Sequence, residues 1–163
     1  MNFTSFPSFL ARFVVLSLIL PFWASIPLTA QELQTPAFRK TSLHGGLGFA
    51  GLYATGFLNL EQMLTQHPDK KITATFAKVG LGSYGSWTDT GDYLYLQYGF
   101  ITGKKANHFE MSAGPNFVLK GEMELPIAFS FAYRHQKPAK SFFYRAGLAY
   151  PESLFFGMGL AFF

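Results

Sequence analysis

Apolar residues alternate with small or polar residues along most of this chain. A period of two is typical of β-strands with two different faces, because successive side chains of a strand point to opposite sides. The pattern is clearest in residues 107–118. There, Phe109 and Phe117 fall on one face and Glu110 falls on the other. The chain is therefore predicted to be all-β.

Turn residues divide the alternating stretches at regular intervals. Each connection carries Pro, Gly, Asn, Asp or Lys, as turns require. The expected connections are residues 65–71, 88–91, 102–107, 119–123, 135–140 and 150–152. The expected strands are residues 52–64, 72–87, 92–101, 107–118, 124–134, 141–149 and 153–163. Strands at this spacing predict a β-sandwich or a β-barrel.

The second face of these strands separates a soluble architecture from a membrane architecture. The outward face of a soluble β-protein usually carries Lys, Glu, Thr and Gln, whereas this face is mostly Gly, Ala and Ser. Charged residues make up 13% of the chain, about half of the roughly 25% typical of soluble domains. A face of small residues suits a crowded interior, and the aromatic and aliphatic face then suits lipid. This inverted pattern is typical of transmembrane β-barrels.

A single-chain bacterial barrel has an even number of strands, so an eighth strand is required upstream of the seven. Residues 39–49 are the stretch available for it. Gly45, Gly46 and Gly48 blur its boundary, and one long bent strand over residues 42–64 stays an alternative. The predicted fold is an eight-stranded antiparallel up-and-down transmembrane β-barrel with short loops over residues 39–163. A barrel of this size has an interior filled by side chains or wide enough for one small ligand.

Both ends of such a barrel domain are expected in the periplasm. The connections 65–71, 102–107 and 135–140 then face the periplasm. The loops near residue 50 and at 88–91, 119–123 and 150–152 face outward. All four outer loops are short, which argues against a large receptor surface.

Residues 1–30 have the layout of a signal peptide. Arg12 precedes an apolar run over residues 13–23, and Ala30 supplies a cleavage site. The alternative is a retained membrane anchor, but the run of 11 residues is far shorter than the roughly 20 needed to span a bilayer. Cleavage would leave residues 31–38 as an N-terminal extension. The chain has no cysteine, which excludes a lipoprotein anchor, a disulfide and a thiolate metal site.

The alternation places five charged side chains on the lumen side: Glu61, Lys78, Glu110, Arg134 and Arg145. One interpretation is a path for a ligand or for protons. The favoured interpretation is a structural plug, because charges in a narrow lumen must be paired or neutralised.

Aromatic residues at strand ends are expected to form girdles at the two membrane interfaces. These are Tyr53, Trp87, Tyr93, Tyr133, Tyr144 and Tyr150. The expected partners of the outer surface are outer-membrane lipids, and the barrel is expected to be a monomer. The weak excess of positive charge is scattered, so nucleic-acid binding has no support.

His108, Glu110 and Ser112 superficially resemble the Ser, His and carboxylate set of membrane-embedded lipid hydrolases. Side chains two apart on a strand are about 7 Å from each other, since the strand rises 3.2–3.4 Å per residue, and a nucleophile and its base must lie about 3 Å apart. No catalytic residue and no cofactor are therefore predicted. His44, His67 and His135 show no metal-ligand spacing.

Several segments resemble those of small uncharacterised outer-membrane β-barrel proteins and, more distantly, OmpX/OmpA-type eight-stranded barrels. The resemblance covers residues 45–163. It rests on Leu58-Asn59-Leu60-Glu61, on Tyr98-Gly99-Phe100-Ile101-Thr102-Gly103-Lys104 and His108-Phe109-Glu110-Met111-Ser112-Ala113-Gly114, and on Phe143-Tyr144-Arg145-Ala146-Gly147. The closing strand ends in Phe162 and Phe163, which resemble the terminal aromatic read by the barrel-assembly machinery. The resemblance implies insertion into the cell outer membrane.

The sequence thus favours an integral outer-membrane barrel with a plugged lumen, no catalytic activity and a structural or unassigned envelope role. Two alternatives remain open. One is an exported soluble barrel that binds a small apolar ligand, and the other is an outer-membrane lipid-modifying hydrolase.

Overall fold

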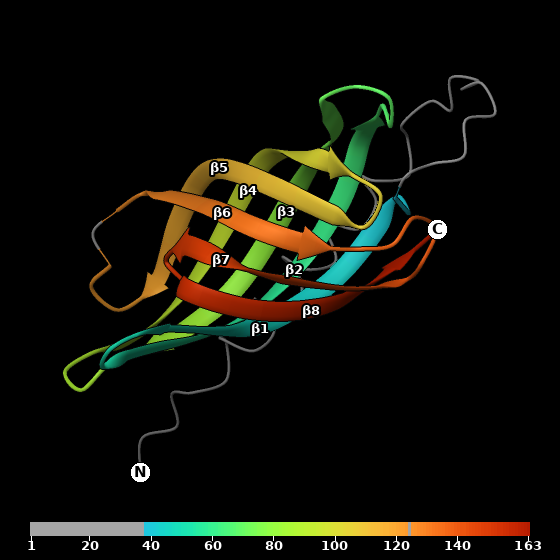
Figure 1. The fold of residues 1–163 in the computed structure, drawn as a ribbon. Coiled ribbons are helices and arrows are strands. Elements are labelled where there is room, and N and C mark those ends of the chain that lie inside the picture. Colours follow the sequence, from blue (N-terminus) through green and yellow to red (C-terminus); the bar gives the residue numbers. More distant parts are fainter. Residues whose placement is uncertain (1–37, 124) are drawn as a thin grey trace, which may run out of the picture. The chain divides into compact units, whose positions relative to one another are not determined.

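The computed structural model describes residues 38–123 and 125–163, which form a closed antiparallel β-barrel of eight strands (Figure 1). Each strand pairs with the next along the chain, and the last pairs with the first. The strands are β1 (Thr41–Ala50), β2 (Tyr53–Gln66), β3 (Ile72–Gly85), β4 (Thr90–Lys104), β5 (Asn107–Lys120), β6 (Ile127–His135), β7 (Phe142–Tyr150) and β8 (Ser153–Phe162). The predicted all-β, eight-stranded up-and-down barrel is confirmed.

The boundary between the first two strands settles the alternative of one long bent strand. β1 ends at Ala50 and β2 begins at Tyr53, which is the register partner of Ala50. Gly51 between them has a φ of 62°, a left-handed conformation that favours glycine in tight turns. The stretch therefore folds as a β-hairpin, and the first strand predicted over residues 39–49 is present as the separate strand β1, Thr41–Ala50.

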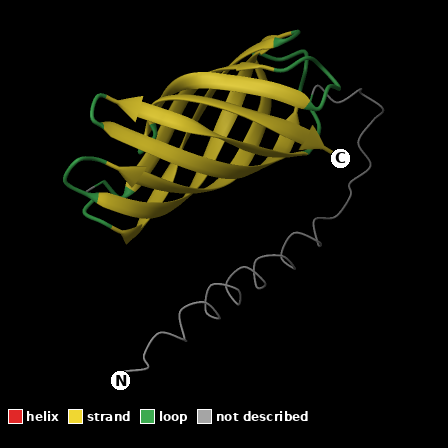
Figure 2. Ribbon diagram, turned by 90° about the horizontal axis from the view of Figure 1, so that it is seen from below, coloured by secondary structure: helices red, strands yellow, loops and turns green. Residues whose placement is uncertain are grey.

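The connections gather at the two ends of the barrel (Figure 2). We call the end that holds the C-terminus the terminal rim, and it carries the connections 67–71, 105–106 and 136–141. We call the opposite end the loop rim, and it carries the connections 51–52, 86–89, 121–126 and 151–152. The barrel closes at the terminal rim, where the Lys40 amide donates to the Phe163 carbonyl at 2.7 Å. No helix in the described part of the chain is long and apolar enough to cross a membrane.

The outward face of the barrel is apolar around its circumference. Leu96 and Phe156, from opposite sides of the strand order, are 50% and 51% exposed. Exposed large apolar side chains come from every strand, among them Leu43, Leu58, Leu81, Leu96, Phe109, Phe131, Leu148 and Leu160. The sheet therefore presents an apolar face away from the barrel axis.

Glycine on the inward face makes room for aromatic rings in the lumen. Tyr93 and Tyr95 on β4 have Gly82 and Gly80 as register partners on β3. A Cβ on either glycine would overlap the tyrosine ring that lies across it. Glycine in a strand often marks such a close approach, and the large ring covers the backbone that glycine leaves bare. The small residues of the second face are thus explained by the packing of the lumen.

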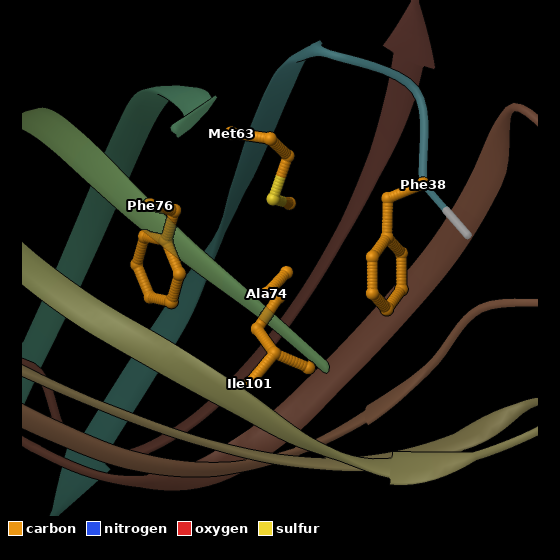
Figure 3. Packing of buried hydrophobic residues seen from close by; sticks show 5 residues of the cluster. All are labelled: Phe38, Met63, Ala74, Phe76 and Ile101. Atoms are coloured by element: carbon orange, nitrogen blue, oxygen red, sulfur yellow. The ribbon is translucent and has the colours of Figure 1, made fainter. Parts of the chain in front are cut away.

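An apolar cluster fills the lumen towards the terminal rim. Phe38 packs there with Met63, Ala74, Phe76 and Ile101 (Figure 3). The Phe38 ring is also edge-on to His108, with centroids 4.8 Å apart. The Gln66 amide fixes the backbone of Phe38 by accepting from its N–H and donating to its carbonyl, both at 2.9 Å. Phe38, expected as part of the extension, therefore belongs to the packed core of the barrel.

Candidate functional site

The candidate site is the polar interior of the barrel. The structure places Glu61, Lys78, Glu110, Arg134 and Arg145 in the lumen, each with at most 2% of its surface exposed. They come from β2, β3, β5, β6 and β7, and the period of two of each strand points them to the axis. Because the barrel is closed, residues far apart in the sequence meet across its interior.

Arg134 joins two carboxylates. Its Nη1 donates to Glu61 Oε1 at 2.6 Å and lies 3.6 Å from Glu110 Oε2. Its Nε donates to Gln136 Oε1 at 2.8 Å, and its guanidinium stacks over the Phe143 ring with 4.1 Å to the centroid. Ionic, hydrogen-bonding and cation–π contacts therefore all hold this buried charge.

Arg145 continues the network towards the loop rim. Its Nη2 donates to Glu110 Oε1. Its Nη1 lies 3.0 Å from His44 Nε2, and its guanidinium lies 5.4 Å from the centroid of Phe155. We call Glu61, Glu110, Arg134, Arg145 and His44 the lumen network. Its carboxylates and guanidinium groups alternate, which offsets part of the cost of burying each charge.

Lys78 lies beside the network and forms no salt bridge with any described residue. Its Nζ lies 5.8 Å from the centroid of Tyr95 and 5.9 Å from that of Phe76. The described lumen also buries Glu152 from the β7–β8 turn, so three cations and three carboxylates are buried in all. The formal charges of these six side chains therefore cancel.

A second polar group lies under the β7–β8 turn. The Tyr95 hydroxyl lies 2.5 Å from Glu152 Oε1 and 2.6 Å from Asn59 Oδ1. Thr55 Oγ1 donates to the Glu152 carbonyl at 3.3 Å. This group ties β2 and β4 to the turn that closes the lumen at the loop rim.

The lumen leaves little free volume. A cavity lined by Lys78, Tyr95, Arg145, Glu152 and Phe155, among others, measures about 10 Å³. That is roughly the room of one water molecule and far below the several hundred Å³ of a ligand pocket. The arrangement can hold the strands together electrostatically, but this cavity cannot accept a lipid or a drug-sized ligand.

Sequence reasoning missed several members of the lumen. His44, Glu152, Asn59 and Gln97 are all buried. The alternation of Ser42 and His44 would have placed both inward, but the neighbouring glycines obscured the first strand. Nothing in the sequence shows that Glu152 turns inward from a connection, because that depends on the three-dimensional path of the turn.

Two of the predicted interfacial aromatics, Tyr93 and Tyr53, are wrong. Tyr93 has none of its surface exposed and stacks against Tyr95 in the lumen, with centroids 6.0 Å apart. It lies inward because it has the same parity as Tyr95 and Gln97, so its place near a strand end does not decide its side.

Tyr53 also turns inward, because it has the same parity as the buried Thr55 and Phe57 on β2. Its ring stacks against the buried Tyr84, with centroids 5.5 Å apart.

The remaining girdle residues lie on or near the outer surface. Trp87 is 83% exposed in the 86–89 loop, and Tyr133 is exposed near the end of β6. Tyr144 and Tyr150 are half-buried. At the chain end, Phe162 is half-buried in β8 and Phe163 is exposed, with their rings 5.5 Å apart.

The three residues that resemble a hydrolase set make their hydrogen bonds elsewhere. His108 Nε2 lies 3.2 Å from the Lys105 carbonyl, Glu110 binds Arg145, and Ser112 Oγ donates to Gln97 Oε1 at 2.7 Å. All three are buried in the lumen. Among residues 38–123 and 125–163, no group of three or more His, Asp or Glu side chains could hold a metal ion.

An open depression of about 570 Å³ lies at the loop rim, lined by residues 86–90 and 120–122. Its two loops are joined by Tyr84, whose hydroxyl donates to Asp89 Oδ2 at 2.6 Å and accepts from the Glu122 amide at 3.1 Å. The hydrogen bond from Tyr84, and then that from the Glu122 amide, hold the pKa of the Asp89 carboxyl below its usual value of 3.8. The joined loops hold Trp87 at the edge of the barrel.

Comparison with protein-family models, with curated proteins and with solved structures found no match.

Proposed function

We propose that this protein is an integral outer-membrane β-barrel with a plugged lumen. It is exported by residues 1–30 and serves a structural or other envelope role without catalytic activity. Its partners are outer-membrane lipids and, during insertion, the barrel-assembly machinery, which recognises the closing strand with Phe162 and Phe163.

The observation that carries the proposal is the inverted distribution of charge and apolar surface. Arg134 and Arg145 are 0% and 1% exposed, whereas every strand exposes large apolar side chains on its outward face. Soluble proteins rarely expose a contiguous apolar surface larger than a few hundred Å². A lipid environment removes the cost of that surface, because the outward side chains then contact acyl chains.

The closed ladder supports the same conclusion. β1 pairs with β8 over nine residue pairs from Thr41↔Phe162 to Phe49↔Leu154, so the barrel has no free edge. Backbone groups exposed to hydrocarbon must be satisfied internally, and closed barrels meet this requirement. The strands of 9 to 15 residues also reach the length of about 9–11 residues that a tilted transmembrane strand needs.

The filled lumen favours a structural role over transport or ligand carriage. The soluble carrier of a small apolar ligand would need an apolar cavity, whereas the lumen holds paired charges around a space of about 10 Å³. The hydrolase alternative would need a catalytic set reachable from the outer leaflet, whereas Ser112 and His108 are enclosed.

Fractionation of cells that express the full chain tests the proposal. We expect the protein in the outer-membrane fraction, resistant to urea extraction, and migrating faster on a detergent gel before heating than after. Recovery in the soluble periplasm without detergent would contradict the proposal. Identical lipid profiles of cells with and without the gene are expected, and a change in lipid acylation would support the hydrolase instead.

A further inference from the structure

The exposed basic residues gather at one end of the barrel. Nine Lys and Arg side chains are exposed among the described residues, and eight of them lie at or next to the terminal rim. We call these eight the basic collar: Arg39, Lys40, Lys70, Lys71, Lys104, Lys105, Lys137 and Lys140. The ninth, Lys120, lies at the loop rim.

The loop rim has the opposite character. Asp89, Asp92 and Glu122 lie there beside Lys120. Each of the aspartates accepts a hydrogen bond from a hydroxyl, Asp89 from Tyr84 and Asp92 from Ser83. The exposed charge is therefore distributed unevenly between the two ends of the barrel. The collar does not result from a high overall charge, because the net charge of the whole chain is only +4.

The collar is not neutralised by the barrel itself. The salt bridges of the described residues all lie in the lumen. At the terminal rim the exposed acidic side chain of the described residues is Asp69. Eight basic side chains thus lie near one carboxylate, and the excess needs an external counter-charge.

The collar runs around the rim next to the apolar surface. It takes members from all three connections of this end and from the segment that enters β1. Lys71 directly precedes the exposed Ile72, and Lys140 comes two residues before the exposed Phe142. Long lysine stems can lie along apolar surface while the ammonium group reaches the polar boundary. Such a ring of basic residues is complementary to a layer of anionic groups that lies directly beside the hydrocarbon region of a membrane.

We propose that the basic collar binds the anionic phospholipid headgroups of the leaflet at the terminal rim. This inference rests on the proposed membrane insertion. Lysines act as point charges towards phosphate, and basic residues beside a membrane attract anionic lipid over about one Debye length. The collar would therefore hold the barrel at a fixed depth and orientation, with anionic lipids enriched around this end.

The test uses the full-length protein purified from membranes and reconstituted in vesicles of phosphatidylcholine with and without phosphatidylglycerol. Native mass spectrometry of the released protein, or spin-labelled lipid, measures which lipid is retained. We expect enrichment of phosphatidylglycerol by at least about threefold, lost at high salt because ions screen exposed charge. The variant with Lys70→Gln, Lys71→Gln, Lys104→Gln and Lys105→Gln should lose most of the enrichment.

Lys120→Gln is the matched control, since it removes a lysine from the loop rim, and it should keep the preference. If the fourfold variant does not fold, the preference for phosphatidylglycerol is measured on the double variant Lys137→Gln with Lys140→Gln and on the wild type at increasing salt. Both the double substitution and high salt should reduce the preference. Insertion into both kinds of vesicle without a preference for phosphatidylglycerol would overturn the collar and leave the proposed function standing. Equal enrichment by wild type and variant would also overturn it. Failure to insert into any vesicle would overturn the proposed function itself.

Discussion

The phenol ring of Tyr95 on β4 lies across Gly80, its register partner on β3, and its hydroxyl bridges Asn59 and Glu152. This pair shows how the lumen is built. Because Gly80 has no side chain, the tyrosine ring from the next strand can cross the interior and contact polar groups near the loop rim.

Gly80→Ala should therefore destabilise the barrel. The added methyl group would overlap the Tyr95 ring and Asn59, and overpacking of this kind costs about 1–3 kcal/mol. Urea unfolding of the refolded protein would measure the change. Gly56→Ala is the control, because a Cβ there meets only Leu47 Cδ2 at 3.9 Å, and it should stay within about 0.5 kcal/mol of wild type. Equal costs for the two variants would contradict the packing described for Tyr95.

The pair of Glu110 and Arg145 predicts a strong asymmetry between single and double substitutions. Glu110→Leu alone leaves the Arg145 charge buried without its carboxylate and should cost about 3–5 kcal/mol. Glu110→Leu combined with Arg145→Leu removes both charges and should cost clearly less. The free energies of unfolding of both variants, measured in detergent, test this asymmetry. Asp69→Asn, in an exposed connection, is the control and should leave the free energy of unfolding unchanged. A double variant less stable than the single one would show that the network does not act as a plug.

The loop-rim contact between Tyr84 and Asp89 predicts a dependence on acid pH. The carboxylate of Asp89 is favoured in the folded state, so its pKa lies below the unfolded value. The stability from this contact is present above the unfolded pKa of about 3.9 and is lost as the pH falls through the lower folded pKa. Carboxyl ¹³C resonances followed over a pH titration should give Asp89 a pKa below 3.8, and Tyr84→Phe should raise that pKa. Tyr133→Phe, at the terminal rim, should leave it unchanged; the same shift in both variants would contradict the role of Tyr84.

Phe38 closes the lumen at the terminal rim, so its side chain should contribute to the stability of the barrel. Phe38→Ala removes contacts with Met63, Phe76 and Ile101, and loss of a buried phenylalanine costs about 3–5 kcal/mol. Leu52→Ala, in the exposed 51–52 connection, should cost little. A Phe38→Ala variant as stable as wild type in urea would place Phe38 outside the core.

The sequence was sufficient to predict the fold because alternation is a local property. The eight strands, their order and the inward side of Glu110, Arg134 and Arg145 follow from the period of two and from the turn residues. Phe143 and Phe155 are large residues on an inward face that is otherwise mostly small or polar, and they lie beside the guanidinium groups of Arg134 and Arg145. Their size is thus matched to the buried charges that they contact.

The contacts of the site were not predictable to the same extent. Which carboxylate meets which guanidinium depends on the shear of the closed barrel, and this is a non-local property. Tyr93 and Tyr53 lie near strand ends, but their parity along the strand turns both rings into the lumen. The opposed glycines Gly80 and Gly82 were the available signal that Tyr93 and Tyr95 turn inward.

The central claim is that the outward apolar face contacts lipid, and a spin label on β4 tests it most directly. The chain has no cysteine, so Leu96→Cys offers a single labelling position in the middle of that strand. In vesicles, the label should collide often with dissolved oxygen and rarely with a water-soluble nickel chelate, and a label at Trp87→Cys in the loop should show the reverse preference. A label at position 96 that the nickel chelate reaches as readily as the loop label would contradict the membrane-spanning barrel.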